Sequence, residues 1–294
     1  MNKLGFYIIY ILLKATSFLP FFILHLISDF LYFLIFHVLK YRRKVVTENL
    51  INSFPEKNIT EIKQIEKGFY RHLCDLIIEN IKLLNISPKE IEKRCKIKNP
   101  ELLNKYYDEG KSIIAVVGHY CNWEWGIMLP IVCKHKVLAI YKPISDKNFN
   151  EFYKNMRSRF GVEPISMKET FKRMFYYDRN NQPILTVFIG DQTPHIGEIQ
   201  YSMPFLNQNT PVFIGTERIA EKLNHVVVFL KMQKVKRSYY EVDAVLLNEN
   251  PTQMKEYALT NQHVNFLEDI IKEKPDYWLW SHRRWKYAKK AFKT

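Results

Sequence analysis

The chain has 294 residues, of which 47% are hydrophobic, 25% charged and 15% aromatic. This composition excludes a disordered or collagen-like protein, and the length allows one large domain or two small ones. The formal net charge is +14. An excess of this size favours a polyanionic partner, which could be a nucleic acid, an anionic lipid or an acidic protein.

Residues 4–39 form an apolar, aromatic-rich leader. We expect Ser17 to cap a helix that tolerates Pro20 in its first turn and runs to about Leu39. Such a helix approaches the length needed to span a bilayer, and the basic segment 40–44 behind it would stay cytoplasmic. A basic body that follows an apolar leader favours a membrane surface over DNA as the partner.

Two charges argue against a simple membrane span. Asp29 would lie in the middle of the helix, at a cost of about 2.5–3.5 kcal/mol, and Lys14 interrupts the first apolar stretch. A helical hairpin that lies in one leaflet is the alternative, and a buried pair of core helices is a third. We predict a membrane anchor at residues 1–40, as a helix or hairpin, and one catalytic domain at residues 41–294.

The body alternates helical and extended patterns, which predicts an α/β fold with a mixed, mostly parallel sheet flanked by helices. A helical pattern covers residues 44 to about 95. Strands are expected at residues 112–117, 136–141, 163–166, 184–189, 226–232 and 240–247, and further helices at 125–133, 148–160, 169–177, 211–223 and 252–273.

Polar residues follow two of these strands at the point where each ends. Gly118-His119 follows the strand at 112–117, and Gly190-Asp191-Gln192 follows the strand at 184–189. Because open α/β sheets bind ligands at the carboxyl ends of their strands, we expect His119 and Asp191 on the same edge.

Five residues after His119 comes Glu124. A histidine can remove the proton from a hydroxyl, and a carboxylate can orient the ring and stabilise the imidazolium. This spacing brings the two side chains together only if the intervening residues turn, and a purely structural histidine is the alternative. All five tryptophans lie near this segment or near the C-terminus, which favours either a shaped pocket or ordinary core packing.

Several motifs share their order with one known family. They are Tyr41-Arg42-Arg43 leading to Asn49-Leu50, then Ser53-Phe54-Pro55-Glu56, Gly118-His119-x4-Glu124-x-Gly126, Gly190-Asp191-Gln192 and Trp280-Ser281-His282-Arg283-Arg284-Trp285-Lys286. With these motifs the chain resembles the late acyltransferases of lipid A biosynthesis, the lauroyl/myristoyl type, over nearly its whole length.

The resemblance implies a glycerolipid-acyltransferase-like fold and transfer of a fatty acyl chain from acyl carrier protein, or a related thioester, to a hydroxyl of a lipid A precursor. It places the enzyme at the cytoplasmic face of the bacterial inner membrane. His119 would be the general base with Glu124 as its partner, and Asp191 matches a family acidic position. The family also has a functional arginine, for which Arg159 is our choice and Lys168 the fallback.

The residues fit this chemistry without a cofactor. Direct attack on a thioester needs a base and an oxyanion stabiliser but no covalent nucleophile, and no Gly-x-Ser-x-Gly elbow occurs. We read Cys121 as a small buried hydrophobe rather than a nucleophile. The four cysteines form no CxxC pair and the histidines no HExxH, so we expect no metal, and no nucleotide-binding fingerprint occurs.

Arg283 and Arg284 begin a basic block that continues through Lys286, Lys289, Lys290 and Lys293. We expect the two arginines to bind a phosphate of the glycolipid acceptor or of the carrier's phosphopantetheine. A basic surface would also steer an acidic carrier protein. The alternatives are another glycolipid or an aminolipid as acceptor, or a catalytically inactive protein that binds lipid or carrier. The apolar leader disfavours a nucleic-acid partner.

Overall fold

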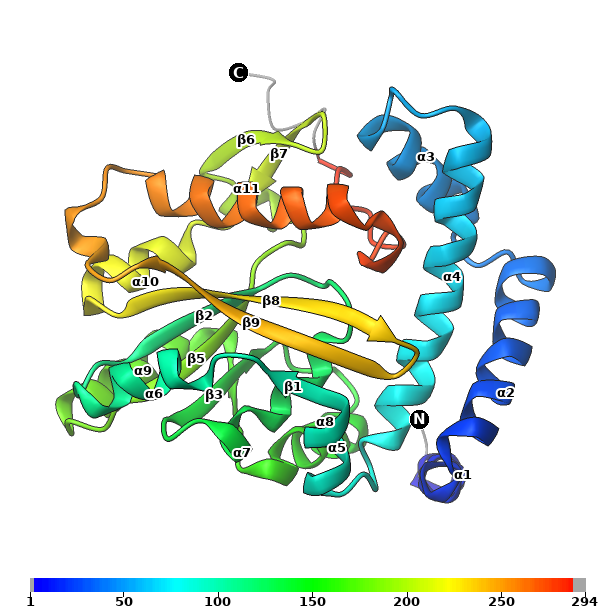
Figure 1. Ribbon diagram of the computed structural model, residues 1–294, viewed down its shortest axis with the longest axis horizontal. Coiled ribbons are helices and arrows are strands. Elements are labelled where there is room, and N and C mark those ends of the chain that lie inside the picture. Colours follow the sequence, from blue (N-terminus) through cyan, green and yellow to red (C-terminus); the bar gives the residue numbers. More distant parts are fainter. Residues whose placement is uncertain (1–2, 288–294) are drawn as a thin grey trace.

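The computed structural model describes residues 3–287, and Figure 1 shows a layered α/β fold with a wall of helices along one side. Seven strands form one sheet in the order β1-β9-β8-β2-β5-β3-β4, and β6 and β7 form a separate ribbon. The strands are β1 (Cys95–Ile97), β2 (Ile113–Val117), β3 (Lys136–Tyr141), β4 (Glu163–Ser166), β5 (Ile184–Ile189), β6 (Tyr201–Phe205), β7 (Gln208–Val212), β8 (Val226–Lys236) and β9 (Tyr239–Asn248).

The helices surround the sheet and continue into the N-terminal wall. The α-helices are α1 (Lys3–Phe18), α2 (Phe21–Tyr32), α3 (Arg43–Ser53), α4 (Ile59–Lys82), α5 (Pro88–Arg94), α6 (Pro100–Asp108), α7 (Leu129–Val132), α8 (Lys147–Arg157), α9 (Thr170–Arg179), α10 (Gly215–Leu223) and α11 (Ala258–Glu273). The π-helix η1 (Phe33–Val38) extends α2. The 3₁₀ helices are η2 (Trp123–Met128), η3 (Ser158–Phe160), η4 (Met167–Glu169), η5 (Ile196–Glu198), η6 (Pro251–Gln253) and η7 (Pro275–Tyr277).

The sheet is parallel at every pairing except the β8–β9 hairpin, which confirms the predicted mixed, mostly parallel fold. Strand β2 lies at its centre between β5 and β8, and its apolar residues are almost fully buried. Helix α11 covers one face, where Phe266 packs against Phe229 of β8. A continuous apolar run is typical of a strand that is covered on both faces.

Two predicted helices begin later than expected. The helix expected at 211–223 begins at Gly215, because β7 pairs with β6 as an antiparallel ribbon in which Thr210 lies opposite Met203. The helix expected at 252–273 begins at Ala258, after the short turn η6. Strand β7 forms only because β6 pairs with it, and the apolar pattern of residues 211–223 alone does not show that pairing.

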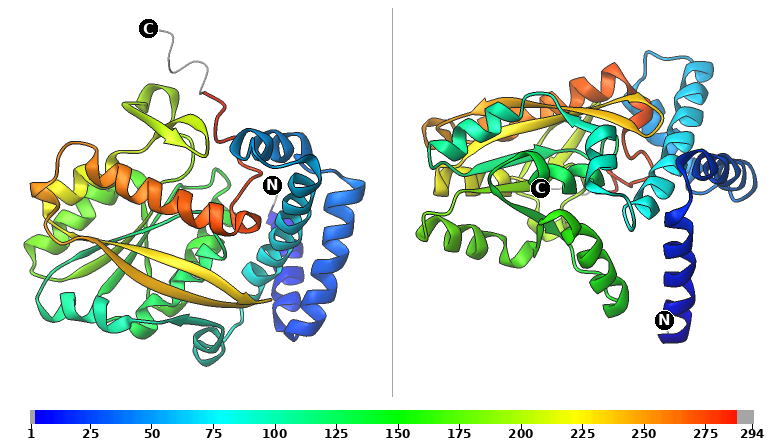
Figure 2. Two further views of the ribbon diagram at one scale, coloured as in Figure 1. Left: turned by 45° about the horizontal axis from the view of Figure 1, so that its top comes forward. Right: turned by 60° about the horizontal axis from the view of Figure 1, so that its bottom comes forward.

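The leader folds as two helices rather than one. Ser17 lies inside α1 and its hydroxyl donates to the Lys14 carbonyl at 2.6 Å, while Pro20 precedes α2 as its cap residue. The stretch Phe21–Val38 is long and apolar enough to cross a membrane. Figures 1 and 2 show α2 running along α4 at the side of the sheet.

The polar residues of the leader bond to the body of the protein. The Lys14 ammonium donates to the Leu84 carbonyl at 2.9 Å, and Ser28 donates to Asp75 of α4 at 2.8 Å. Asp29 pairs with Arg237, at the tip of the β8–β9 hairpin, at 2.7 Å. Lys14 and Asp29 are the two charges that argue against a membrane span. Their contacts place both on the side of the leader that faces the body of the protein.

Two buried histidines predict how the stability of the fold depends on pH. Burial lowers the pKa of His72 to about 3 and that of His263 to about 4, whereas both take up protons near pH 6.5 in the unfolded chain. The unfolded state therefore binds more protons below pH 6.5, so we expect the free energy of unfolding to fall by about 1.4 kcal/mol per pH unit for each histidine as the pH drops towards 4.

Urea unfolding between pH 7 and pH 4.5 measures this dependence. Glutamine does not titrate, so His263→Gln should reduce the slope of unfolding free energy against pH by about 1.4 kcal/mol per pH unit. An unchanged slope in that variant would show that His263 is already protonated in the folded protein.

Candidate active site

Strand pairing brings His119 and Asp191 together. Strands β2 and β5 are parallel neighbours in which Val117 lies opposite Ile189, so the residues two positions further on also lie opposite one another. The Nδ1 atom of His119 lies 2.5 Å from Oδ1 of Asp191. The expectation that both residues share one edge of the sheet is confirmed.

Asp191 accepts three hydrogen bonds in a nearly closed site. Besides the His119 ring, its donors are the His119 backbone N–H and the Trp278 indole N–H, each at 2.8 Å from Oδ2. Burial by itself would raise the pKa of Asp191, but the charge of His119 and these hydrogen bonds outweigh it and lower the pKa to about 2. Because an ionised carboxylate only accepts hydrogen bonds, the proton of the neutral imidazole lies on Nδ1, and Nε2 has a free lone pair.

The His119 ring is more accessible than the carboxylate that holds it. Its side chain is 16% exposed, whereas that of Asp191 is 4% exposed. The Gln192 amide nitrogen lies 3.1 Å from Nε2, and the Trp123 ring stands edge-on to the imidazole at 4.9 Å between centroids. A base whose other nitrogen is held by a buried carboxylate is arranged to accept a proton at Nε2.

Glu124 has a different partner from the one we expected. Its two carboxylate oxygens accept from Nε and Nη2 of Arg157 at 2.9 and 2.5 Å, and among residues 3–287 it has no hydrogen bond with His119. The reason is the short helix η2, which turns the chain after Asn122 and directs Glu124 towards the end of α8. The orienting carboxylate of the histidine in this structure is Asp191.

The structure separates the two candidates for the functional arginine position from this site. Arg159 donates to the backbone carbonyls of Leu83 and Ile86, which follow the C-terminus of α4. Lys168 is exposed on η4, next to the edge strand β4. Arg157 was missed, although it stands two residues before Arg159, because the sequence does not show which of two neighbouring arginines faces Glu124.

The C-terminal segment packs against residues 118–122, the loop that carries His119. The backbone N–H of Leu279 donates to the His119 carbonyl at 3.1 Å, and that of Cys121 donates to the Tyr277 carbonyl at 3.0 Å. Asn49 of α3 donates to the carbonyls of Trp280 and His282, both at 2.9 Å. The motifs near the two ends of the chain therefore meet behind His119, and Trp278, which contacts Asp191, is a site residue that sequence reasoning did not single out.

The two arginines of the C-terminal motif lie in different environments. Arg283 is exposed, whereas Arg284 is 2% exposed and donates to the Pro211 carbonyl at 2.7 Å. Burial lowers the pKa of Arg284 to about 10. It lines a second cavity together with Asp191, so it faces the interior of the protein. Lys289, Lys290 and Lys293 lie outside the described residues.

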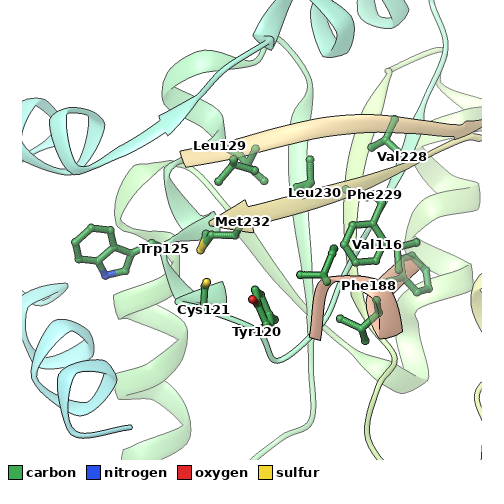
Figure 3. Packing of buried hydrophobic residues seen from close by; sticks show 14 of the residues in the cluster. Val116, Tyr120, Cys121, Trp125, Leu129, Phe188, Val228, Phe229, Leu230 and Met232 are labelled. Atoms are coloured by element: carbon green, nitrogen blue, oxygen red, sulfur yellow. The ribbon is translucent and has the colours of Figure 1, made fainter. Parts of the chain in front are cut away.

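A small apolar cavity lies next to His119, where Gly118 and Trp123 contribute to its lining, and part of it is open to solvent. Figure 3 shows Leu129 close to Leu230 and Met232 of β8, with Trp125 further to one side, and all four residues line the cavity. The lining also includes Gly118, Tyr120, Trp123, Gly126, Phe229, Leu267 and Ile270.

The burial of Cys121 agrees with its reading as a small hydrophobe. Cys121 is fully buried, and burial raises the pKa of its thiol, so it packs as a small hydrophobe. Within residues 3–287, no group of three or more His, Cys, Asp and Glu side chains is placed to hold a metal ion.

The structure defines an α/β protein in which a partly exposed histidine, held by a buried carboxylate, lies at the carboxyl edge of the sheet beside an apolar cavity. The chain matches the family model for bacterial lipid A biosynthesis acyltransferases over residues 1–287, and it belongs to that family. It is therefore an acyltransferase of lipid A biosynthesis. Among curated proteins, none matches this chain.

The ion pair between Glu124 and Arg157 predicts a specific pattern of mutational coupling. Glu124→Ala and Arg157→Ala should each lower acyl transfer by about 10²-fold, because either change frees η2 and shifts Trp123 against the base. In a double-mutant cycle the two losses should be strongly non-additive, with a coupling of about 0.5–3 kcal/mol. Additive losses, together with strong coupling between Glu124 and His119, would show instead that Glu124 acts on the base.

Proposed function

We propose that this enzyme transfers a fatty acyl chain from the thioester of acyl carrier protein to a hydroxyl group of a lipid A precursor, with His119 as the general base. The contact between His119 and Asp191 carries the proposal, because it holds the proton of the neutral ring on Nδ1 and leaves the lone pair on Nε2, in a side chain that is 16% exposed. Membership of the acyltransferase family supports the class of reaction.

In this mechanism Nε2 of His119 takes the proton of the acceptor hydroxyl while the hydroxyl oxygen attacks the thioester carbonyl carbon. The tetrahedral intermediate then collapses, the carbon–sulfur bond breaks, and the leaving thiolate takes the proton from the imidazolium. Asp191 stabilises the imidazolium between these steps. The buried, three-fold hydrogen-bonded carboxylate supports this role because it stays ionised at neutral pH.

The apolar cavity is the proposed site of the acyl chain. Gly118 and Trp123 line it beside the catalytic histidine, and apolar side chains of β8 and α11 line it further on, so a chain bound there would place its carbonyl group near His119. Burying each methylene of the chain would contribute about 0.8 kcal/mol to binding. The net charge of +14 and the exposed Arg283 favour an acidic carrier as donor.

The leader is the proposed membrane contact, with α1 and α2, which Figure 1 shows at a steep angle to one another, lying in one leaflet at the cytoplasmic face of the inner membrane. Its outward side is apolar, whereas its polar groups bond to α4 and to the β8–β9 hairpin. A helix that crossed the bilayer would have to break those contacts. The large apolar residues of these helices that are more than half exposed are Leu4, Tyr7, Ile8, Ile11, Leu12 and Phe18 of α1, and Phe22, Leu26, Phe30, Phe33 and Val38 of α2 and η1.

Changing this surface should weaken membrane binding and leave the fold intact. Phe22→Glu combined with Leu26→Glu should lower binding to anionic vesicles by tenfold or more, because burying each such side chain is worth about 1.5–3 kcal/mol. Phe175→Glu on α9, an exposed position away from the leader, is the matched control. Vesicle co-sedimentation measures the effect, and equal binding of all three proteins would contradict the proposed contact.

Acyl transfer from carrier-protein thioesters of increasing chain length to a tetra-acylated lipid A precursor, in detergent micelles, tests the proposed reaction. We expect product with one range of chain lengths and none when the precursor is omitted. Transfer only to another glycolipid or to an aminolipid would replace the acceptor in this proposal. Absence of turnover with every donor and acceptor would indicate a binding protein without activity.

A further inference from the structure

We propose that Gln192 is a gate on the catalytic base: its side-chain amide occupies Nε2 of His119 until an acceptor hydroxyl displaces it, and this prevents water from using the base to hydrolyse the acyl donor. The inference rests on the proposed role of His119.

The geometry defines which way the hydrogen bond between the two side chains runs. Asp191 holds Nδ1 at 2.5 Å and therefore keeps the proton of the neutral ring on that nitrogen. Nε2 can then only accept, so the Gln192 amide, whose nitrogen lies 3.1 Å away, donates to it. This hydrogen bond uses the one lone pair that a substrate proton would need.

The Gln192 side chain is free to move away from His119, unlike Asp191, which binds Nδ1 of the same ring. Asp191 is buried and held by three donors, whereas Gln192 is only half-buried, follows it directly, and precedes the largely exposed segment 195–200. Among the interactions found within residues 3–287, its side chain contacts only His119 by a hydrogen bond. A glutamine held by one hydrogen bond can be displaced by a ligand whose other contacts stabilise it in the site.

The gate matters because a bound thioester is also a substrate for water. In the unwanted reaction a water molecule gives its proton to Nε2, the resulting hydroxide attacks the thioester carbonyl carbon and the carbon–sulfur bond breaks. The thiolate then takes the proton from the imidazolium, and the products are a free fatty acid and the carrier thiol. Water must compete with the Gln192 amide for Nε2, and it has no further contacts with which to do so.

Hydrolysis of an acyl carrier protein thioester, measured without any acceptor, tests the gate. We expect Gln192→Ala to raise hydrolysis by about three- to tenfold, the range that one neutral hydrogen bond is worth. Gln192→Met, which keeps the length of the side chain without its polar groups, should have the same effect. Gln182→Ala is the matched control, because Gln182 is an exposed glutamine that precedes β5, at the end of the strand opposite Gln192.

Two further variants separate this gate from a structural role. Adding His119→Ala to Gln192→Ala should abolish the extra hydrolysis. Gln192→Glu should lower hydrolysis and move the acidic limb of the rate–pH profile to higher pH, because a carboxylate beside Nε2 favours the protonated ring. Hydrolysis that stays at the wild-type rate in both Gln192→Ala and Gln192→Met would overturn the proposal.

The outcomes also distinguish a failure of the gate from a failure of the proposed function. If wild type hydrolyses the donor in a His119-dependent way but acylates no acceptor, the proposed acceptor is wrong and the effect of Gln192 is still measured. If His119→Ala changes neither hydrolysis nor transfer, the proposed base is wrong, and the gate with it.

Discussion

Replacing His119 by alanine should lower acyl transfer by about 10²–10⁴-fold, because in the proposed mechanism the reaction then loses the group that takes the proton of the acceptor hydroxyl. The loss should appear in kcat, and the KM for each substrate should change little. Steady-state kinetics with the carrier thioester and the lipid A precursor measure both quantities.

The control for this change is His195→Ala, which removes an exposed histidine from the segment that follows Asp191. Both variants should keep the helix content and vesicle binding of the wild type. A His119→Ala protein that still transfers acyl chains within tenfold of the wild-type rate would exclude His119 as the base.

Replacing Asp191 by asparagine should be nearly as damaging, with a loss of about 10²–10⁴-fold. Asparagine preserves the shape of the carboxylate, but it cannot stabilise the imidazolium by charge, and its amide N–H can bond Nδ1 and so move the ring proton to Nε2. The loss should again appear in turnover. Single-turnover measurements with pre-bound donor separate this chemical step from product release.

Asp191→Glu is the companion variant, because it keeps the charge but moves it by one carbon in a site where three donors hold the carboxylate. We expect it to retain more activity than Asp191→Asn. If asparagine at this position were harmless while Glu124→Ala abolished transfer, Glu124 would be the carboxylate that matters for the base.

The sheet, and the placement of His119 and Asp191 at one edge of it, could be predicted from the sequence because both depend on local patterns. Two continuous apolar runs identify β2 and β5, and the carboxyl ends of parallel strands lie at the same edge of a sheet. That β2 and β5 are direct neighbours depends on the strand order, which these patterns do not give. Their pairing in register then sets the distance between the side chains.

The partners of Glu124 and Asp191 could not be predicted in the same way. Arg157 and Trp278 lie 33 and 87 residues away along the chain from the groups that they bond, and these contacts form only when α8 and the C-terminal segment pack against the loop. A spacing of five residues between His119 and Glu124 therefore suggested a contact that the helix η2 prevents.

The leader illustrates the same limit. Its apolar composition predicted a membrane contact, but the break at Pro20 and the bonds of Lys14 and Asp29 to the body depend on helix α4 and on the tip of the β8–β9 hairpin. Hydropathy measures how apolar a segment is, and it carries no information on which side of a helix faces protein.

The most direct test of the account compares the single-turnover rates of His119→Ala, Asp191→Asn and the variant with both changes. If the two side chains act as one unit, the double variant should lose no more than His119→Ala alone, because Asp191 contributes only through the histidine. Losses that multiply in the double variant would contradict this, and would show that Asp191 acts on the reaction independently of the base.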